Sequence, residues 1–304
     1  MAQGAPLLSR MLRHARRVEA PPRGLDSLIA DSLGLSDTVL PWAEALRRAC
    51  RRPQREGHLL RFRLLHIRAD ISNAVAHPLL LDDEDSSRLI NDLNDEFQVD
   101  SHFDALAPGD GLLWLRTASA PPRLPHARDI LGQPLAAWAE RQRQHRETFR
   151  LHNEMQMFLH LHPLNRQREQ QGLPIVNGLW YWGAGDCRRT RSDLRLFSDD
   201  AEIRALGDAC AGGSATLSEL AGLPRGEAAL VVWTGWLRIL QEAQDTDPAL
   251  ALKRFDREAI RPLLSRRRPF QLLTGDGSEL ALHPLDRLRF WHKADGWEKL
   301  EPRP

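Results

Sequence analysis

The sequence has few cysteines, a single tyrosine and no long apolar run. Its 304 residues include three cysteines and nine tryptophans. Cys50, Cys187 and Cys210 are scattered, odd in number and form no C-x-x-C pair, so neither a disulfide framework nor a zinc ribbon is expected. No apolar stretch approaches the roughly 20 residues that span a bilayer, and the N-terminus carries no signal-peptide pattern. These absences predict a cytoplasmic protein without a membrane segment.

The chain also lacks an excess of charge of either sign. Lysine and arginine together number 42 and aspartate and glutamate 41, which leaves a net charge of +1. No global field therefore attracts nucleic acid. Two basic clusters, 188–195 and 264–268, could contact phosphates, but a solvated loop and a helix C-terminus also explain them, and no binding motif of known geometry accompanies them. Nucleic-acid association is accordingly the second alternative function.

Sequence motifs of well-known enzyme classes are absent as well. The chain has no P-loop, no dinucleotide-binding fingerprint, no nucleophile elbow and no serine in a recognisable triad context. An apolar fraction of 42% with 27% charged residues is ordinary for a globular chain of one to two domains. The composition therefore indicates an ordinary globular protein but does not indicate which reaction, if any, it catalyses.

Apolar periodicity predicts a mixed, helix-rich α/β fold, with a sheet flanked by helices and a hairpin-containing C-terminal part. Pro163 is expected to break the longest helix near His160, and two apolar runs around Asp276 and Gly277 predict a hairpin. A weak polar break near 190 divides the chain into 1–190 and 191–304, unless it forms one compact domain. Helices are expected at 5–18, 24–33, 41–51, 83–97, 135–171, 200–211, 234–243 and 248–266, and strands at 58–68, 112–116, 175–182, 228–233 and 288–291.

The run 153–185 carries the densest set of chemically specific side chains. Trp180 and Trp182 share one face of an expected strand, because side chains alternate along a strand. Gly183 and Gly185 then end the strand in a turn where backbone N–H groups can bind an anion. Two tryptophans on one strand face are more often core than ligand contacts, although the same rings can wall a pocket from the core side.

Polar residues of this run have two alternative roles. Arg168, with Asn165 and His162, could bind a phosphate or carboxylate, since arginine offers a bidentate fork. Asn165 and Asn177 could instead cap the helix break and the following turn. Both roles stay open from the residues alone.

Four histidines, His145, His152, His160 and His162, suggest a metal cluster at first sight. Positions 145 and 152 share a helix face but lie about two turns apart, which is too far to ligate one ion. Histidines 160 and 162 flank an expected kink and have no thiol or acidic partner at ligand spacing apart from Glu154. We therefore predict no metal at this run.

The spacing within the run resembles the archaeal-type, cofactor-independent phosphoglycerate mutases. That family carries H-P-x-N-x-x-R-x-x-x-G-x-x-x-A/V-N-x-x-W-x-W-G-x-G, which is matched here from His162 to Gly185. A second family segment, P-P-H-D-I-x-G, is similar to 125–132, with two extra residues between His126 and Asp129. Over most of its length the chain is more similar to the RpfE-like bacterial regulatory proteins, which look like relatives of these mutases. The ligand-binding residues that the resemblance implies are His126, Asp129, His162, Asn165, Arg168, Asn177, Trp180, Trp182, Gly183 and Gly185.

Those mutases need two divalent metals held by Asp and His, plus a serine that takes up the phosphoryl group. The first ligand should follow an early apolar strand, yet 11–35 is arginine-rich and helical in pattern. The late candidates His283, Asp286, His292 and Asp295 do not match the family spacing. The resemblance therefore covers a substrate-side segment without the metal-bearing core.

The function predicted from these observations is non-catalytic. We expect a phosphoglycerate-mutase-like protein with a regulatory or partner-binding role, which binds a small phosphorylated or carboxylate acid and needs no cofactor. The first alternative is a metal-dependent phosphoglycerate mutase or phosphohydrolase, and only that alternative calls for a divalent metal. The identity of a protein partner does not follow from the sequence.

Overall fold

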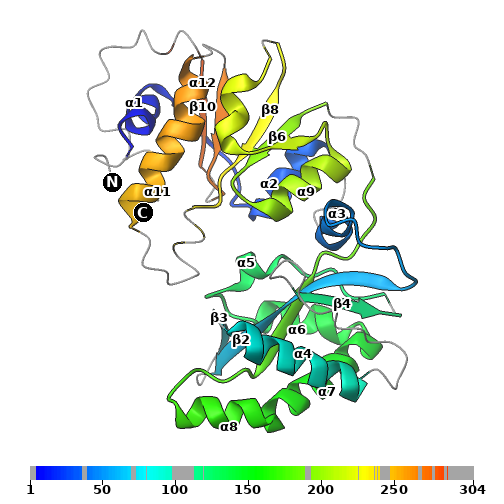
Figure 1. Cartoon of the computed structure of the whole chain (residues 1–304). Helices are drawn as coiled ribbons and strands as arrows, with labels where there is room; N and C mark the ends of the chain where they lie inside the picture. The colour runs from blue at the N-terminus through cyan, green and yellow to red at the C-terminus, as the bar shows by residue number, and fades with distance from the viewer. Residues whose placement is uncertain are drawn as a thin grey trace. The chain divides into compact units, whose positions relative to one another are not determined.

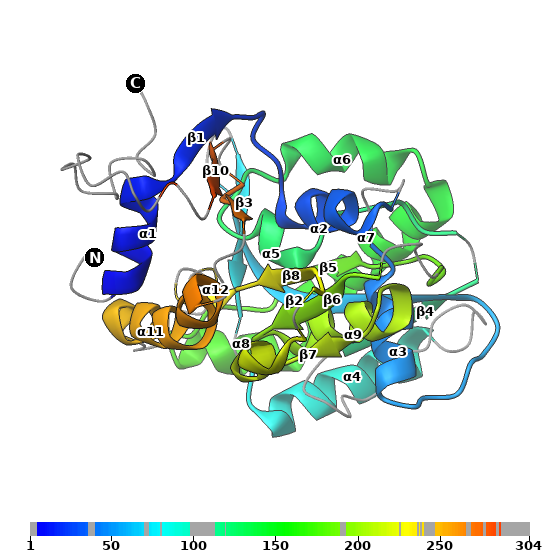
Figure 2. The same cartoon turned by 90° about the horizontal axis from the view of Figure 1, so that it is seen from above.

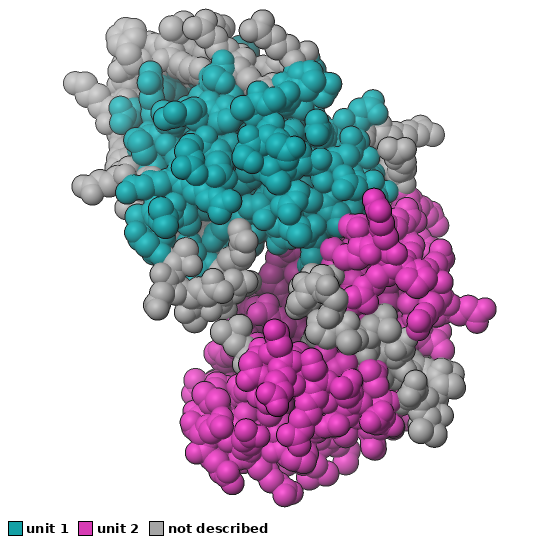
Figure 3. All heavy atoms as spheres, viewed as in Figure 1, with its two compact units in different colours: residues 1–38, 189–304 teal, residues 39–188 magenta. Residues whose placement is uncertain are grey.

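The chain forms two compact units in a computed structural model (Figure 3), one built from residues 1–38 and 189–304 and the other from 39–188. The structure describes residues 5–35, 40–69, 73–79, 81–97, 113–118, 120–188, 193–224, 226–235, 237, 239, 247–265, 269–275, 278–283 and 286. Helices flank several sheets, which confirms the mixed α/β fold class. None of the helices in these ranges is long and apolar enough to span a membrane.

The first unit holds two three-stranded sheets within its described residues. One is antiparallel and joins both ends of the chain, with the order β1 (Arg16–Glu19), β10 (Ser278–Leu282) and β9 (Phe270–Leu273). The other is parallel, with the order β7 (Ser214–Ala215), β6 (Arg195–Ser198) and β8 (Ala229–Val232). The predicted C-terminal hairpin is confirmed by the β9–β10 pairing, while its turn at 276–277 lies outside the described residues.

Helices of the first unit include one continuous run from Pro248 to Ser265, close to the predicted 248–266. A π-helical turn, η3 (Asp256–Ile260), joins its two α-helical ends. The predicted strand 288–291 lies outside the described residues, as does most of the predicted helix 234–243. The helical elements are α1 (Pro6–His14), α2 (Leu25–Leu33), α9 (Ala201–Cys210), η2 (Leu217–Gly222), α11 (Pro248–Phe255) and α12 (Arg261–Ser265).

The N-terminal helix shares a hydrophobic core with the C-terminal half and also takes its cap from there. The Asp256 carboxylate accepts hydrogen bonds from the backbone N–H groups of Leu7 (3.1 Å) and Leu8 (2.7 Å). An acceptor at a helix N-terminus satisfies donors that have no partner inside the helix.

The grouping of 1–38 with 189–304 differs from the 1–190 segment that the sequence suggested. The predicted helix 5–18 ends early, and 16–19 forms β1 instead.

The second unit is built around one long strand, β2 (His58–Ala69), to which every other strand of its sheet pairs antiparallel (Figure 1). Successive stretches of β2 pair with β4 (Leu113–Thr117), β5 (Gly178–Trp182) and β3 (Ala74–Pro78). Alternate apolar residues such as Leu60, Phe62 and Leu64 are buried, as the predicted strand requires.

The predicted helix 135–171 is broken at two places. Pro163 begins a new helix, so the predicted break is confirmed at His162. The second break, at 144–145, is not apparent from the sequence: the stretch from 140 to 147 is wholly polar and offers no apolar side chain to hold one straight helix on the sheet. The helices of this unit are α3 (Trp42–Ala49), α4 (Asp83–Phe97), α5 (Ala127–Ile130), α6 (Ala136–Arg143), α7 (Arg146–Leu161) and α8 (Pro163–Gln170).

The two faces of β5 are covered by different elements. The Tyr181 ring lies 5.9 Å from the ring of His152 on α7, whereas the Trp182 ring lies 4.7 Å from the ring of His126, the N-cap of α5. The predicted alternation is therefore confirmed: α7 covers one face, and α5 the other. Figures 1 and 2 show α7 and α5 within this unit from two directions.

His152 makes the stability of the protein depend on pH. Burial lowers its pKa from 6.5 to about 4, because the charged imidazolium would lose its hydration. The unfolded chain therefore binds more protons between these values, and stability falls as the pH drops through this window. We expect a loss of about 2 kcal/mol between pH 7.5 and pH 5, measured by urea unfolding. The variant His152→Leu should remove this loss of stability. The control is His160→Leu, an exposed position on the same helix, which should keep the loss. Equal pH dependence of stability in both variants would contradict the assignment of the loss to His152.

Candidate functional site

His162 is the N-cap of α8. Its Nδ1 accepts a hydrogen bond from the backbone N–H of Leu164 (3.2 Å), so the neutral ring carries its proton on Nε2. That Nε2 lies 3.0 Å from the Asp92 carboxylate on α4 and donates to it. The ring is 4% exposed and also packs against Phe158. His162 thus ties α8 to α4.

Asn165 joins the break between α7 and α8 to the chain that enters β5. Its side-chain amide donates to the carbonyls of Leu159 (2.6 Å) and Val176 (2.7 Å), and its carbonyl accepts from the N–H of Val176 (2.7 Å). Asn165 is 4% exposed. Three buried backbone groups therefore depend on this one amide.

Asn177 extends the sheet by one step before β5 begins. Its carbonyl accepts from the N–H of Ile67 (2.6 Å), and its amide donates to the Ile67 carbonyl (2.9 Å). The side chain imitates a paired strand residue at this point of β2. Asn165 bonds the Leu159 carbonyl at the helix break, as the capping alternative expects, whereas Asn177 bonds across the sheet to Ile67 and not within the turn after Gly172.

Arg168 is buried, with 6% of its surface exposed. Its Nε donates to the carbonyl of Pro174 (2.7 Å), and its guanidinium lies 3.9 Å from the Asp85 carboxylate. The backbone N–H of Leu173 donates to the Arg168 carbonyl, which closes the turn at the end of α8. Arg168 thus has a positioning role for the chain between α8 and β5.

We expect Arg168→Ala to lower the free energy of unfolding by about 2 kcal/mol, since a buried carbonyl then loses a charged donor. The control is Arg166→Ala on the same helix, where the side chain is exposed and the expected change is within about 0.5 kcal/mol. Urea unfolding followed by circular dichroism measures both. Equal stability of the two variants would show that the Arg168 contacts contribute nothing to the fold.

The second group of residues lies on the opposite face of the sheet. Trp180 donates its indole N–H to the Pro125 carbonyl (2.9 Å), and the Trp182 ring contacts His126. The His126 ring also meets the Trp42 ring of α3 edge-on, with centroids 5.4 Å apart. Both tryptophans of β5 are less than 5% exposed, as the core interpretation predicts. The two sequence segments that resemble the mutases therefore meet here.

His126 has the same capping geometry as His162. Its Nδ1 accepts from the N–H of Arg128 (3.1 Å), so the neutral ring carries its proton on Nε2. Arg128 is 8% exposed and its guanidinium lies 4.8 Å over the Trp42 ring. Asp129 is half-buried in the same helical turn, where its N–H donates to the His126 carbonyl.

The glycine turn after β5 supports the start of α3. Gly183 has φ +79°, and its carbonyl accepts from the N–H of Ala43 (3.1 Å). A Cβ at this position would lie 2.8 Å from the Cβ of Trp42. Gly185, with φ +146°, lies against Pro41. Glycine is required at 183 both by its backbone conformation and by the close approach of Trp42.

Sequence reasoning missed Arg61. This residue is 0% exposed, and its guanidinium carbon lies 4.4 Å over the Trp114 ring. The only signal in the sequence is an arginine at a position of β2 flanked by the apolar Leu60 and Phe62. Trp42 and Trp114 were also missed, because neither belongs to the segments that resemble the mutases.

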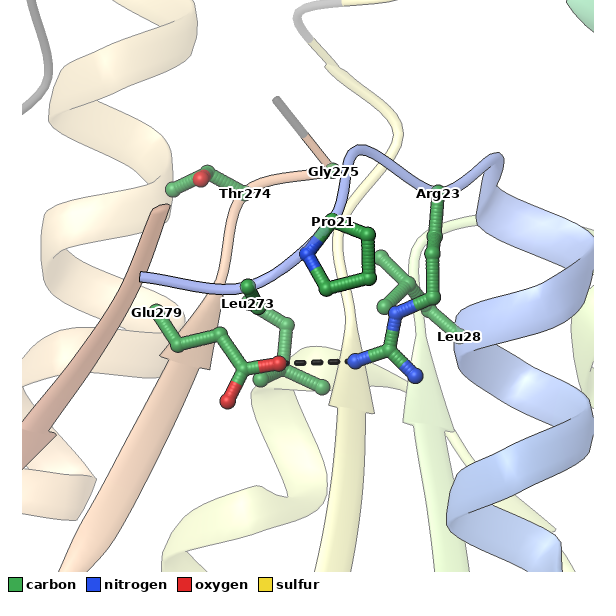
Figure 4. A pocket seen from close by; sticks show the side chains of 8 residues that line it. Pro21, Arg23, Leu28, Leu273, Thr274, Gly275 and Glu279 are labelled. Atoms are coloured by element: carbon green, nitrogen blue, oxygen red, sulfur yellow. Dashed lines mark hydrogen bonds and ion pairs between the residues drawn. The ribbon is translucent and has the colours of Figure 1, made fainter. Parts of the chain in front are cut away.

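A small pocket in the first unit carries a different chemistry (Figure 4). It is lined by Ala20, Pro21, Arg23, Leu28, Leu273, Thr274, Gly275 and Glu279. The Arg23 guanidinium donates to the Glu279 carboxylate (2.7 Å) and to Asp31. Its positive charge is therefore neutralised by two carboxylates, which makes the pocket a poor anion site.

The possible metal ligands do not come together in the described part of the chain. No group of three or more His, Cys, Asp or Glu residues there could hold an ion. His152 and His162 are buried while His145 and His160 are exposed, so the four histidines do not share a face. The Asp286 carboxylate accepts from the N–H of His283 (2.9 Å) and pairs with Arg16 (3.3 Å). His292 and Asp295 lie outside the described residues, as do most arginines of the two basic clusters.

No family model matches this sequence, and no curated protein does. Among solved structures the chain is similar to the PH0037 protein from Pyrococcus horikoshii, at 12% identity and a TM-score of 0.44, over 86% of this chain and 70% of that one. It is also similar to a cofactor-independent phosphoglycerate mutase from Thermoplasma acidophilum DSM 1728, at 13% identity and a TM-score of 0.36, over 91% of this chain and 81% of that one. Both likenesses are distant ones of fold, and no site residue is assigned from them.

Proposed function

We propose that the chain is a non-catalytic, phosphoglycerate-mutase-like protein that binds a small phosphorylated or carboxylate acid. Its role is regulatory: the bound acid alters how the protein engages a partner, as the resemblance to the RpfE-like proteins implies. The observation that carries the proposal is the meeting of His126 with Trp182 beside the Gly183 turn. Pro125 and Trp180, which are 55 residues apart in sequence, are joined there by a hydrogen bond.

The chemistry of this place favours an anion. The indole N–H of Trp182 is buried and has no hydrogen-bond acceptor among the described residues, whereas the Trp180 N–H donates to the Pro125 carbonyl and His126 Nδ1 caps α5. The buried guanidinium groups of Arg61 and Arg128 lie over the rings of Trp114 and Trp42. By contrast, the other polar residues of the segment already contact backbone or carboxylate groups of the protein; these residues are His162, Asn165, Arg168 and Asn177. The proposal therefore assigns binding to the His126–Trp182 half of the segment and gives the His162–Asn177 half a structural role.

The test is a thermal-shift series on the full chain with 3-phosphoglycerate, 2-phosphoglycerate, phosphoenolpyruvate and inorganic phosphate, with and without Mn²⁺. A ligand that binds only the folded state stabilises it by about 2.7 kcal/mol at one hundred times its Kd. We expect a rise in melting temperature with at least one phosphorylated acid in the absence of metal.

Two matched variants locate the site. His126→Asn keeps an N-cap acceptor but removes the Nε2–H, and should abolish the shift. His162→Asn makes the same exchange at the other capping histidine and should retain it. No shift with any of the four probes contradicts the proposal. A shift that requires Mn²⁺, together with interconversion of the two phosphoglycerates, would instead support the enzyme alternative.

A further inference from the structure

Two histidines lie side by side on the sheet of the second unit, where β2 pairs with β3. His66 of β2 and His77 of β3 are directly opposite each other in the antiparallel register. Residues in that position direct their side chains to the same face of the sheet, with Cβ atoms about 5 Å apart. Their ring centroids are 6.4 Å apart, and the rings are tilted by 42°. The pair therefore places two potential metal ligands together.

The ring of His66 has the orientation that a metal ligand needs. Its Nδ1 lies 3.0 Å from the backbone carbonyl of Ile175, and because a carbonyl can only accept, the ring donates from Nδ1. The neutral ring then has its lone pair on Nε2. Histidines that bind a metal through one nitrogen commonly donate from the other to a carbonyl or carboxylate, which fixes the tautomer and the ring orientation. His66 has this arrangement.

The pair is accessible and close to the geometry that one ion requires. Both rings are half-buried, so an ion can reach them from solvent. A tetrahedral ion bound by two imidazole nitrogens at about 2.1 Å places the ring centroids roughly 5 Å apart. The observed separation of 6.4 Å closes to that value through small rotations about the side-chain bonds, without movement of the strands.

The charges near the pair do not exclude a cation. Arg168 donates to the carbonyl of Pro174, next to Ile175, but its guanidinium also faces the Asp85 carboxylate at 3.9 Å, which offsets its charge. Arg68, two residues further along β2, is exposed, and water and salt screen its charge.

We propose that His66 and His77 bind one divalent transition-metal ion of the Zn²⁺ or Cu²⁺ type. Imidazole nitrogen suits these ions, whereas Mg²⁺ and Ca²⁺ prefer oxygen ligands. No third His, Cys, Asp or Glu completes a metal-binding group with the pair in the described part of the chain. Water or an external ligand therefore completes the coordination. One ion on two histidines differs from the two-metal centre, held by Asp and His, that the mutases need.

The metal site is separate from the proposed acid-binding site. Side chains alternate along β2, so His66 lies on the same sheet face as Phe62, which is opposite Tyr181 in the register. His126 contacts Trp182 on the other face. The two sites can therefore be tested independently of each other.

The experiment titrates Zn²⁺ alone into the full chain by calorimetry and records the electron paramagnetic resonance spectrum with Cu²⁺. We expect one ion per chain and a copper spectrum with two coordinating nitrogens. His77→Gln removes one ligand and leaves the contact between His66 and Ile175 in place. This variant should weaken Zn²⁺ binding at least about tenfold and reduce the coordinating nitrogens to one, and His66→Gln should do the same.

The matched control is His58→Gln, an exposed histidine at the start of the same strand, which should keep wild-type affinity. Absence of Zn²⁺ binding by the wild type overturns the proposal. Wild-type affinity in both His66→Gln and His77→Gln, or equal weakening in His58→Gln, assigns the ion to other histidines and also overturns it. If His66→Gln does not fold, as judged by circular dichroism, His77→Gln decides. All these outcomes leave the acid-binding function, which is tested without metal, unaffected.

Discussion

Replacing Asn165 with alanine is expected to lower the free energy of unfolding by about 3 kcal/mol. The side chain serves three backbone groups, the carbonyls of Leu159 and Val176 and the N–H of Val176, all at 2.7 Å or less. A buried polar group that loses its partner costs about 1–3 kcal/mol, and alanine can neither donate nor accept. Urea unfolding monitored by tryptophan fluorescence measures the change.

The control for Asn165 is Asn153→Ala on α7, where the side chain is exposed and the expected change is within about 0.5 kcal/mol. Asn165→Asp adds a second test, since a carboxylate cannot donate to the two carbonyls and should be at least as destabilising as alanine. A loss below about 1 kcal/mol in Asn165→Ala would mean that water replaces the amide, and the structural role assigned to Asn165 would fail.

Gly183→Ala is expected to destabilise the protein by about 3 kcal/mol and to loosen α3 from β5. Two effects add at this position. A non-glycine residue at φ +79° costs about 1–2 kcal/mol. The added methyl group would also lie 2.8 Å from the Cβ of Trp42 and 3.0 Å from the N–H nitrogen of Ala43, so α3 must shift. Urea unfolding measures the stability, and amide hydrogen exchange at Ala43 reports the contact to the Gly183 carbonyl.

Gly172→Ala separates the two effects. Gly172 has φ +69° in the same unit, and a Cβ there would meet no atom within 4 Å. Its expected cost is therefore only the conformational part, about 1 kcal/mol. If both variants lose the same stability, the close approach of Trp42 to Gly183 is not a constraint. If the difference is about 2 kcal/mol, the turn is held by packing against α3.

Local patterns in the sequence were sufficient for many elements. The alternation of Leu60, Phe62 and Leu64 predicted β2, and the amphipathic stripe at 83–97 predicted α4 with the same bounds. Pro163 predicted the break before α8 because a proline ring excludes a continuous helix. Each of these signals depends on residues within a few positions of one another, and such signals are present in the sequence itself.

The candidate site could be predicted only in part. The spacing from His162 to Gly185 singled out one stretch of chain, and in the structure the residues of that stretch lie on two sides of one sheet. Which asparagine caps a break and which indole meets a histidine depend on partners such as Val176 and Pro125. The position of Arg61 could not be recognised from a sequence motif, because its neighbours Trp114 and Trp182 lie on strands that are distant in the sequence.

The sequence by itself determined the fold class, most helices and strands, the break at Pro163 and the alternation of Trp180, Tyr181 and Trp182. Tertiary structure alone decided that Asp256 caps the first helix, that 1–38 belong with the C-terminal half, and that Arg61 lies buried between two tryptophans. The physical reason is the range of the interactions. Helix and strand periodicity act over a few residues, whereas caps, strand register and buried charge depend on contacts between residues far apart in the chain.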